Sequence, residues 1–215
     1  MEQKIDVATW KRREHFELFL HSAQPFFSVT VDVDVTRLWT HCRQHSDVSF
    51  SLASLFFALR AINATEPLRL RLHGEQVIGH DQVAIGTTIL RPDETFGFAR
   101  FDPAPTFAEF QQAGQATIAR VKANVDLDAL PGKDDLIYHS TLPWLRFTSF
   151  TNAMAKHDSI PRLTFGRVTE GNGRFAMPVA IEVHHALVDG LDVALFVERF
   201  EKELAESPLP GVEKR

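Results

Sequence analysis

The residues best suited to chemistry form one short run near the C-terminal end of the chain, His184-His185-Ala186-Leu187-Val188-Asp189-Gly190. The run follows a strand-like segment and precedes a helix-like one, so a short connection holds it. Imidazole has an unperturbed pKa near neutrality, and it can therefore take a proton from a hydroxyl group at working pH. This chemistry requires one fixed tautomer, in which the outward nitrogen carries no proton. Gly190 is expected to give the connection the backbone freedom that such a geometry needs.

Two plainer interpretations of the run remain open from the residues alone. Paired histidines at the end of a strand can have a purely structural role. His184, His185 and Asp189 also carry atoms that bind metal ions, but the run has no convincing further ligand nearby. We therefore favour a general base over a metal site, and we predict no metal-binding residues.

Segments with strand and helix periodicity fill the rest of the chain. Residues 26–35 alternate cleanly, with Val29, Val31, Val33 and Val35 on one face, as in a half-buried strand. Further strands are expected at residues 68–73, 76–79, 83–91, 95–101, 136–141, 145–151, 162–169 and 174–184. One helix is expected to begin near residue 35, and three more are expected at residues 49–62, 106–125 and 191–205. Residues 126–135 are expected to form a loop.

The expected strands outnumber the helices, and the helices fall where they can cover one face of a sheet. In the last strand, Val179, Ile181 and Val183 share one face, while Glu182 and His184 lie on the other. We therefore predict an α/β two-layer sandwich with a mixed β-sheet covered by helices, in a single domain over residues 1–215. A sheet with an uncovered face or edge must hide it, and oligomerisation is one way to do so.

Composition limits the compartment and the partners. The net charge of −5 provides no basic surplus for the phosphates of nucleic acid. No apolar run approaches the ~20 residues that span a bilayer, and the N-terminal residues do not resemble a signal peptide. The single cysteine, Cys42, cannot form an internal disulfide, and we interpret it as a small buried residue. We predict a cytoplasmic protein that binds neither nucleic acid nor membranes.

The run His184–Gly190 has the form HHxxxDG and resembles the active-site motif of the CoA-dependent acyltransferase superfamily. Three other segments single out the chloramphenicol acetyltransferase family within it. Residues 10–16 resemble the family's N-terminal WxRxxHF signature, residues 140–150 resemble its Ser-x-x-Pro-Trp…Phe-x-Ser-Phe segment, and residues 178–183 match the strand before the motif. The resemblance covers nearly the whole chain in the right order, and it implies a CoA-dependent acyltransferase-like fold.

The resemblance also implies roles for the residues of a catalytic centre. His185 matches the general base, which takes the proton of an acceptor hydroxyl as that oxygen attacks the thioester of acetyl-CoA, without an acyl-enzyme. Ser140 matches the donor to the oxyanion, and Thr164 matches a threonine that holds a water molecule near the transition state. Asp189 matches the partner of an arginine at the position of Arg12, in an ion pair that orders the site.

The resemblance implies supporting residues and partners as well. His184 is a positioned neighbour of the base. Arg167 and Trp144 are candidates for the CoA site, and acetyl-CoA acts as a co-substrate rather than as a tightly bound cofactor. Three subunits place the active sites at their interfaces, so the protein is expected to be a homotrimer. The candidates for an apolar acceptor pocket are Phe19, Phe27, Phe96, Phe98, Tyr138 and Phe150.

Several residues depart from well-known members of the family, and these departures leave the acceptor open. Phe19 stands where many members have a tyrosine, Phe98 replaces a small residue, and Asn152 replaces an apolar one. Chloramphenicol is the first hypothesis for the acceptor, and another hydroxyl-bearing molecule is the second. A non-catalytic trimeric binding protein and the core of a 2-oxoacid dehydrogenase complex remain as alternatives.

Overall fold

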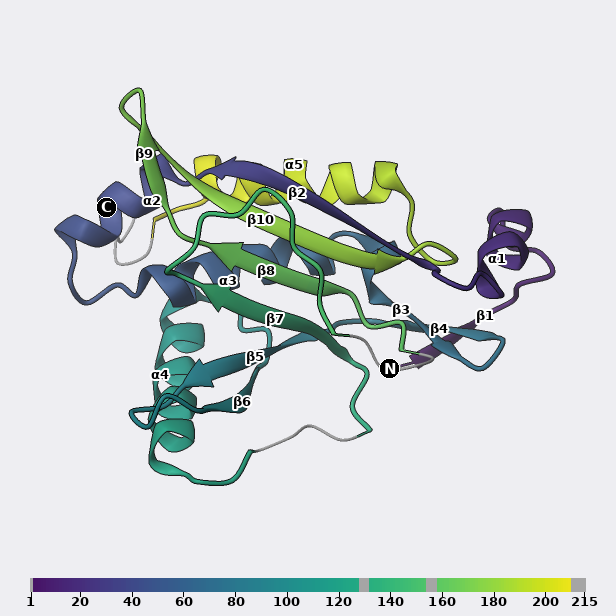
Figure 1. The fold of residues 1–215 in the computed structure, drawn as a ribbon, viewed down its shortest axis with the longest axis horizontal. Helices are drawn as coiled ribbons and strands as arrows, with labels where there is room; N and C mark the ends of the chain where they lie inside the picture. Colours follow the sequence, from purple (N-terminus) through teal and green to yellow (C-terminus); the bar gives the residue numbers. More distant parts are fainter. Residues whose placement is uncertain (1, 128–131, 154–157, 210–215) are drawn as a thin grey trace.

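The main sheet of the molecule has seven strands, six of them in one continuous order and the seventh paired beside it (Figure 1). The computed structural model describes residues 2–127, 132–153 and 158–209. The path runs through β2 (Phe26–Asp34), β10 (Arg174–His184), β8 (Arg162–Gly166), β7 (Leu136–Leu142), β5 (Ala84–Leu90) and β6 (Phe96–Phe101), and β9 (Thr169–Gly171) pairs with β10. The pairs β5–β7 and β7–β8 are parallel, whereas the others are antiparallel. The predicted mixed sheet is confirmed.

Helices cover one face of this sheet and close the core against it (Figure 1). They are α2 (Thr36–Gln44), α3 (Phe50–Asn63), α4 (Phe107–Ala123) and α5 (Gly190–Glu206). The helix α3 is buried around most of its circumference, as its nearly continuous apolar sequence predicts. A capping box begins α4, because Thr106 accepts from the N–H of Glu109 and Glu109 accepts from the N–H of Thr106. The predicted two-layer arrangement is therefore present.

Alternation along the strands separates a covered face from an open face. On β8 and β10, the residues Leu163, Val179 and Ile181 belong to the core under the helices. Their neighbours Thr164 and Glu182 therefore point to the opposite face. We call this opposite face of the main sheet the open face.

A crossing segment, residues 143–153, runs over the open face, where the sequence predicts a strand at residues 145–151. That prediction is wrong, because its backbone groups find separate partners instead of a strand ladder. Ser28 donates from its hydroxyl to the Phe150 carbonyl at 2.9 Å, and the N–H of Asn152 donates to Glu182 at 2.9 Å. The segment approaches β8 closely at Gly166, where a Cβ atom would lie 2.9 Å from the Phe147 ring.

The sequence analysis also missed or merged several elements. It gave no element to residues 2–20, which form β1 (Glu2–Ile5) and α1 (Arg13–Leu20). Residues 162–169 are not one strand, since β8 ends at Gly166 and β9 begins at Thr169. A second, three-stranded sheet has the order β1-β4-β3, with β3 (Leu70–His73) and β4 (Gln76–His80) preceded by the 3-10 helix η1 (Glu66–Arg69). In the described part of the chain, no helix has the length and apolar character to cross a membrane.

Candidate active site

His185 sits in the short connection between β10 and α5, with its ring held between aromatic side chains. The ring of Phe19 stacks on the imidazole at a centroid distance of 3.9 Å and an interplanar angle of 9°. Phe27 approaches it from another side at 4.8 Å. The His185 N–H donates to the carbonyl of Pro25 at 2.7 Å. Ring and backbone are thus both fixed, as a proton-transfer group requires.

Arg12 and Asp189 form a clamp around the same connection. The Arg12 guanidinium binds both carboxylate oxygens of Asp189, with Nη2 3.1 Å from Oδ1, and Nη2 also donates to the His185 carbonyl at 3.1 Å. The hydrogen bond from Arg12 lowers the pKa of Asp189, so the carboxylate stays ionised. The ion pair expected from the family resemblance is present in the structure, and Arg12, the residue just before α1, thereby holds the backbone of His185 in place.

The surroundings of the His185 Nδ1 atom favour one tautomer of the ring. Its Nδ1 atom lies 3.4 Å from Asp189 Oδ1, is buried, and makes no hydrogen bond within the described residues. A carboxylate on this side favours a proton on Nδ1 and leaves Nε2 as the basic atom. Gly190 is not needed for this geometry: it does not have a positive φ, and a Cβ atom there would meet nothing within 4 Å. The expectation about its backbone freedom is wrong.

His184 is buried beside the base and faces the other way. Its Nδ1 accepts from the Ala186 N–H at 3.3 Å, and its ring meets Phe26 edge to face at 5.0 Å. Burial, with a smaller contribution from His185, lowers the pKa of His184 to about 4. It is therefore neutral at working pH and acts as a packed neighbour.

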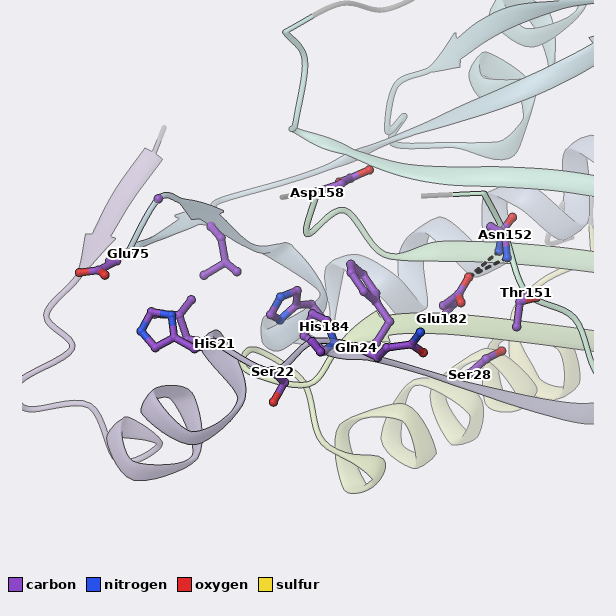
Figure 2. Close-up of a pocket in the computed structure, with 16 residues that line it drawn as sticks. His21, Ser22, Gln24, Ser28, Glu75, Thr151, Asn152, Asp158, Glu182 and His184 are labelled. Carbon is purple, nitrogen blue, oxygen red and sulfur yellow. Dashed lines mark hydrogen bonds between the residues drawn. The ribbon is translucent and has the colours of Figure 1, made fainter. Parts of the chain in front are cut away.

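A large cavity of about 1090 Å³ opens beside His184 (Figure 2). The segment between α1 and β2 lines it on one side, and the β3–β4 turn lines it on another. Its carboxylates come from Glu75, Asp158 and Glu182, and two hydrogen bonds from Asn152 hold Glu182, as Figure 2 shows. The cavity is large enough for a drug-sized molecule or for side chains of a neighbouring subunit.

Sequence analysis did not name Glu182 and Asn152 as a pair. Glu182 is 6% exposed and stands next to Arg162 in the sheet register. A glutamate among the apolar residues of a buried strand is the one signal in the sequence, because a buried carboxylate needs partners. Its partner could not be found that way, since Asn152 lies on the crossing segment, just after the strand that was predicted at residues 145–151.

Ser140 and Thr164 form a second polar site on the open face, at paired positions of β7 and β8. The Ser140 hydroxyl lies 3.3 Å from the Thr88 hydroxyl on β5. Thr164 is fully buried, and its Oγ1 atom has no hydrogen-bond partner within the described residues. A buried hydroxyl without a partner can hold a water molecule.

Within one chain, this second site lies apart from His185. Thr164 pairs with Ala180 on β10, and His185 comes five residues later in the chain. At 3.3 Å per residue this is about 16 Å along the strand, and Ser140 lies about 10 Å away across two strand spacings. In addition, Phe27, which contacts His185, is paired with the core residue Val183 on the covered face. The base and the Ser140–Thr164 pair therefore lie on different sides of the sheet.

Of the six aromatic candidates for the acceptor pocket, two lie at His185, two lie near Ser140, and two lie at neither site. Phe19 and Phe27 contact His185. Phe98 is paired with Thr88 on β5, and its ring meets the exposed ring of Phe96 at 5.6 Å. The remaining two lie elsewhere on the open face, with Tyr138 5.5 Å from the guanidinium of Arg162 and Phe150 5.5 Å from Phe147.

The two candidates for the CoA site lie near each other on the surface. Trp144 is 59% exposed, and Leu145, which follows it, is 57% exposed. The N–H of Arg167, also exposed, donates to the Leu145 carbonyl at 2.8 Å. An exposed indole is suited to stacking on a base, and an exposed guanidinium to binding a phosphate.

Cys42 and the possible metal ligands are less suited than His185 to form an active site. Burial raises the pKa of the Cys42 thiol to about 11, so the thiolate needed for nucleophilic attack is scarce at neutral pH. Within the described residues, the three ligand-type atoms that gather closely enough for a metal ion belong to Glu2, His80 and Asp134, away from His185.

The geometry of His185 and the Arg12–Asp189 clamp can now be compared with known proteins. The chloramphenicol acetyltransferase family profile matches residues 2–201. The chain belongs to the chloramphenicol acetyltransferase family. It is an acyltransferase, and the resemblance inferred from its motifs is confirmed.

Individual relatives agree with this family over nearly their whole lengths. Chloramphenicol acetyltransferase 2 of Haemophilus influenzae is 29% identical over 206 residues, which cover 92% of this chain and 94% of the relative. Chloramphenicol acetyltransferase 3 of Escherichia coli is 29% identical over 212 residues, which cover 96% and 98%.

Solved structures show the same fold. A chloramphenicol acetyltransferase superposes with a TM-score of 0.88 at 29% identity, covering 95% of this chain and 100% of that chain. A dihydrolipoamide acetyltransferase of Azotobacter vinelandii superposes with a TM-score of 0.67 at 17% identity, covering 90% and 86%. The second match shows a shared fold only. The predicted fold class is thus confirmed, and the family match favours a chloramphenicol acetyltransferase-type enzyme over the core of a 2-oxoacid dehydrogenase complex.

Proposed function

We propose that this chain transfers the acetyl group of acetyl-CoA to a hydroxyl group of chloramphenicol, directly and within a ternary complex, with His185 as the general base. The observation that carries the proposal is the fixed imidazole of His185, stacked on Phe19 and clamped through its backbone by Arg12. Membership of a family whose curated relatives are named as chloramphenicol acetyltransferases supports the reaction and the acceptor.

In the proposed reaction, His185 Nε2 takes the proton of the acceptor hydroxyl while that oxygen attacks the thioester carbonyl carbon. The Asp189 carboxylate, 3.4 Å from Nδ1, stabilises the imidazolium that forms. The C–S bond then breaks, and the proton passes from the imidazolium to the CoA thiolate. Asp189 itself takes up no proton during the reaction, because Arg12 holds it as a carboxylate.

Ser140 donates its hydroxyl to the oxyanion of the tetrahedral intermediate in this proposal. Its weak contact with Thr88 at 3.3 Å leaves the hydroxyl able to rotate toward a substrate oxygen. A donor of this kind contributes about 3–4 kcal/mol when it acts on the transition state alone. The unpartnered Thr164 hydroxyl holds a water molecule near the same oxygen.

The proposed active site uses two subunits of a homotrimer. Within one chain, His185 and Ser140 are separated along the strand and across the sheet, so one chain cannot bring both to a single carbonyl. A neighbouring chain whose open face meets the His185 edge brings the two half-sites together. Exposed apolar side chains flank the base, Leu18 at 68% and Leu191 at 70% exposure, and an interface would bury them.

A second candidate function keeps this chemistry and changes the acceptor. Phe98 lies opposite Thr88, which contacts Ser140, so a large ring occupies space next to the proposed oxyanion donor. An acceptor smaller or flatter than chloramphenicol would fit beside such a ring. Chloramphenicol remains the first candidate because the relatives carry its name.

The test measures thiol release from acetyl-CoA with and without chloramphenicol, and then with a panel of other alcohols. Wild type is compared with His185→Ala, with Ser140→Ala, and with His45→Ala as a matched control, because His45 is exposed at the end of α2. We expect acceptor-dependent release that disappears in His185→Ala, falls about 10²- to 10³-fold in Ser140→Ala, and is unchanged in His45→Ala.

Each other outcome has a definite meaning. Release with another alcohol but not with chloramphenicol would retain the mechanism and select the second candidate. Full activity in His185→Ala would refute the proposed base. CoA binding without turnover on any acceptor would indicate a non-catalytic binding protein.

A further inference from the structure

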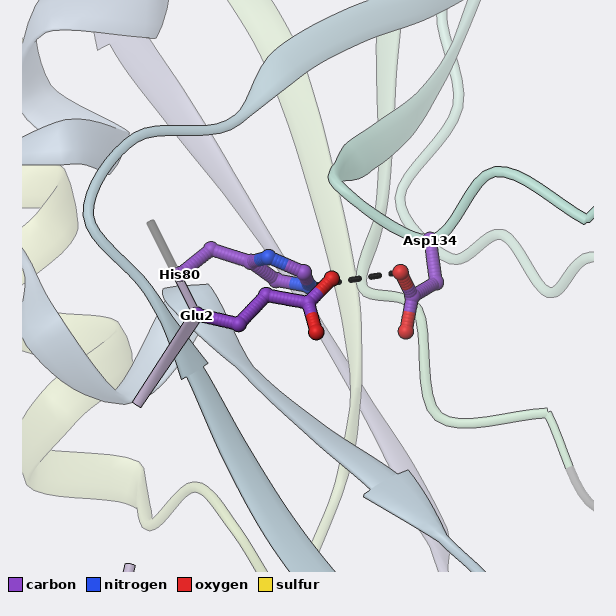
Figure 3. A group of neighbouring side chains, drawn as sticks. All are labelled: Glu2, His80 and Asp134. Atoms are coloured by element: carbon purple, nitrogen blue, oxygen red, sulfur yellow. Dashed lines mark ion pairs between the residues drawn. The ribbon is translucent and has the colours of Figure 1, made fainter. Parts of the chain in front are cut away.

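A cluster of ligand-type side chains lies on the three-stranded sheet, away from the proposed active site (Figure 3). Glu2 on β1 and His80 on β4 are direct partners in the antiparallel register. Asp134, in the segment before β7, points toward both of them (Figure 3). One ligand atom from each of the three lies within 4.8 Å of the others. The fold thus gathers two carboxylates and an imidazole from three distant parts of the chain.

The imidazole of His80 is the unusual member of this cluster. His80 is only 5% exposed, and its Nε2 atom is buried and makes no hydrogen bond within the described residues. Asp134 Oδ1 is 3.3 Å away, but the contact does not meet hydrogen-bond geometry. Buried polar atoms nearly always have a partner. An Nε2 atom that points at two carboxylates without bonding to either is therefore placed to bind a cation between them.

The charges around the cluster suit a divalent ion. Arg71 is fully buried and donates to backbone carbonyls, including that of Asp134, rather than to either carboxylate. Arg71 therefore does not occupy the carboxylate oxygens that would bind a cation.

A second imidazole orients the Asp134 carboxylate. His73 Nε2 lies 2.6 Å from Asp134 Oδ2. This contact occupies Oδ2 and leaves Oδ1 directed toward His80. Side chains that hold a ligand in this way are a regular feature of metal sites.

We propose that Glu2, His80 and Asp134 bind a zinc-type divalent cation, with water completing its coordination and His73 orienting Asp134. One imidazole nitrogen and two carboxylate oxygens are a donor set that favours Zn²⁺ or Co²⁺ over Mg²⁺ and Ca²⁺, which prefer oxygen alone. The ion would fasten β1, an edge strand at the start of the chain, to β4 and to the segment before β7. This role is structural, and it does not depend on the proposed acetyl transfer.

Metal titration of the full-length chain, stripped with EDTA, tests the proposal. Isothermal titration with Zn²⁺ gives stoichiometry and Kd, and the visible spectrum with Co²⁺ reports mixed nitrogen and oxygen ligands. We expect one ion per chain, and an increase in Tm of about 5 to 10 °C at a hundredfold excess of Zn²⁺ over Kd. Mg²⁺ and Ca²⁺ should produce neither effect.

Three variants assign the ligands. Glu2→Gln changes an exposed strand residue and will fold even if His80→Gln does not, and each should abolish the Co²⁺ spectrum. His73→Ala should weaken Zn²⁺ binding about 10- to 100-fold without abolishing it. The control is His45→Ala, because His41 and His45 stack at 4.1 Å on α2 and are the rival pair of imidazoles.

Three results would overturn the proposal, two of them from the variants. One is unchanged Zn²⁺ affinity in Glu2→Gln, which would exclude the cluster. The other is loss of binding in His45→Ala, which would move the site to α2. Absence of any Zn²⁺ binding by the wild-type chain would equally refute it.

Discussion

At the scale of single residues, His185 owes its position to two different kinds of contact. Arg12 and Pro25 fix its backbone, whereas Phe19 and Phe27 fix its ring. The parallel stack with Phe19 restricts rotation of the imidazole. A residue that contacts the base in this way can contribute to turnover without touching the acceptor.

Replacing Phe19 tests whether its ring positions the imidazole of His185 or only contacts the acceptor. Phe19→Ala removes the ring, so we expect the imidazole to reorient and kcat to fall about 10- to 100-fold, since small misplacements of a catalytic group carry costs of this size. Phe19→Tyr retains the stack and should keep most of the activity. Steady-state kinetics with varied acceptor makes the comparison. A rise in KM for the acceptor with unchanged kcat would show that Phe19 is only an acceptor contact.

At the scale of the elements, the sequence predicted best where one physical rule dominates. Apolar alternation located β2 and β10, and the motif at residues 184–190 placed His185 between a strand and a helix. The strand predicted at residues 145–151 is wrong because Phe147 packs against Gly166 of β8, while the backbone of the crossing segment bonds to the side chains of Glu182 and Ser28. No local pattern shows that a segment will cross a sheet instead of joining it.

Other parts of the site were accessible only through the family resemblance or through the fold. The Arg12–Asp189 pair joins residues 177 positions apart, which neither periodicity nor spacing can reveal. The Glu2–His80–Asp134 cluster depends on the register of β1 with β4, and β1 itself was missed because four mostly polar residues carry little strand signal. The predicted roles of all the site residues, His185 included, remain predictions.

The strand β7 affects stability, because its register places a histidine in the core. His139 is 5% exposed, and its ring packs edge to face on Phe165. Its Nδ1 atom and the Thr87 hydroxyl share a hydrogen bond of 2.8 Å. Burial lowers the pKa of His139 to about 3, whereas an unfolded histidine titrates near pH 6.5. The neutral ring is therefore compatible with the fold, and the protonated ring is not.

The direction of the pH effect follows from proton binding. Between pH 6.5 and pH 3 the unfolded chain binds a proton at His139 and the folded chain does not, so stability is full above pH 6.5 and is lost as pH falls. Near pH 5 this one site contributes a slope of about 1.4 kcal/mol per pH unit. We expect urea unfolding of His139→Leu at pH 5 to 6 to show a slope smaller by about that amount.

The slope is the informative quantity, because His139→Leu also changes packing and the absolute stability. The exposed His45 provides the control, and His45→Leu should leave the pH dependence as in wild type. Equal slopes in His139→Leu and wild type would show that His139 is protonated, or accessible to water, in the folded chain.

At the scale of the whole molecule, the separation of His185 from Ser140 determines what an active assembly must be. If each site takes the base from one chain and the oxyanion donor from the next, neither His185→Ala nor Ser140→Ala trimers contain a complete site. In a closed ring of three, every mixed trimer has one interface at which a Ser140→Ala chain supplies His185 and a His185→Ala chain supplies Ser140. Mixing two impaired variants should therefore restore activity.

The size of this restoration can be stated in advance. Random assembly from equal amounts gives mixed trimers in three cases of four, each with one intact site of three, so about a quarter of wild-type activity should return. The measurement is thiol release after co-expression of the two variants with different tags, which also allows mixed trimers to be purified. Each variant expressed alone with both tags is the control. Mixed trimers without restored activity would place His185 and Ser140 in the same chain's site, or outside the site, and would refute the two-subunit arrangement while leaving the family assignment intact.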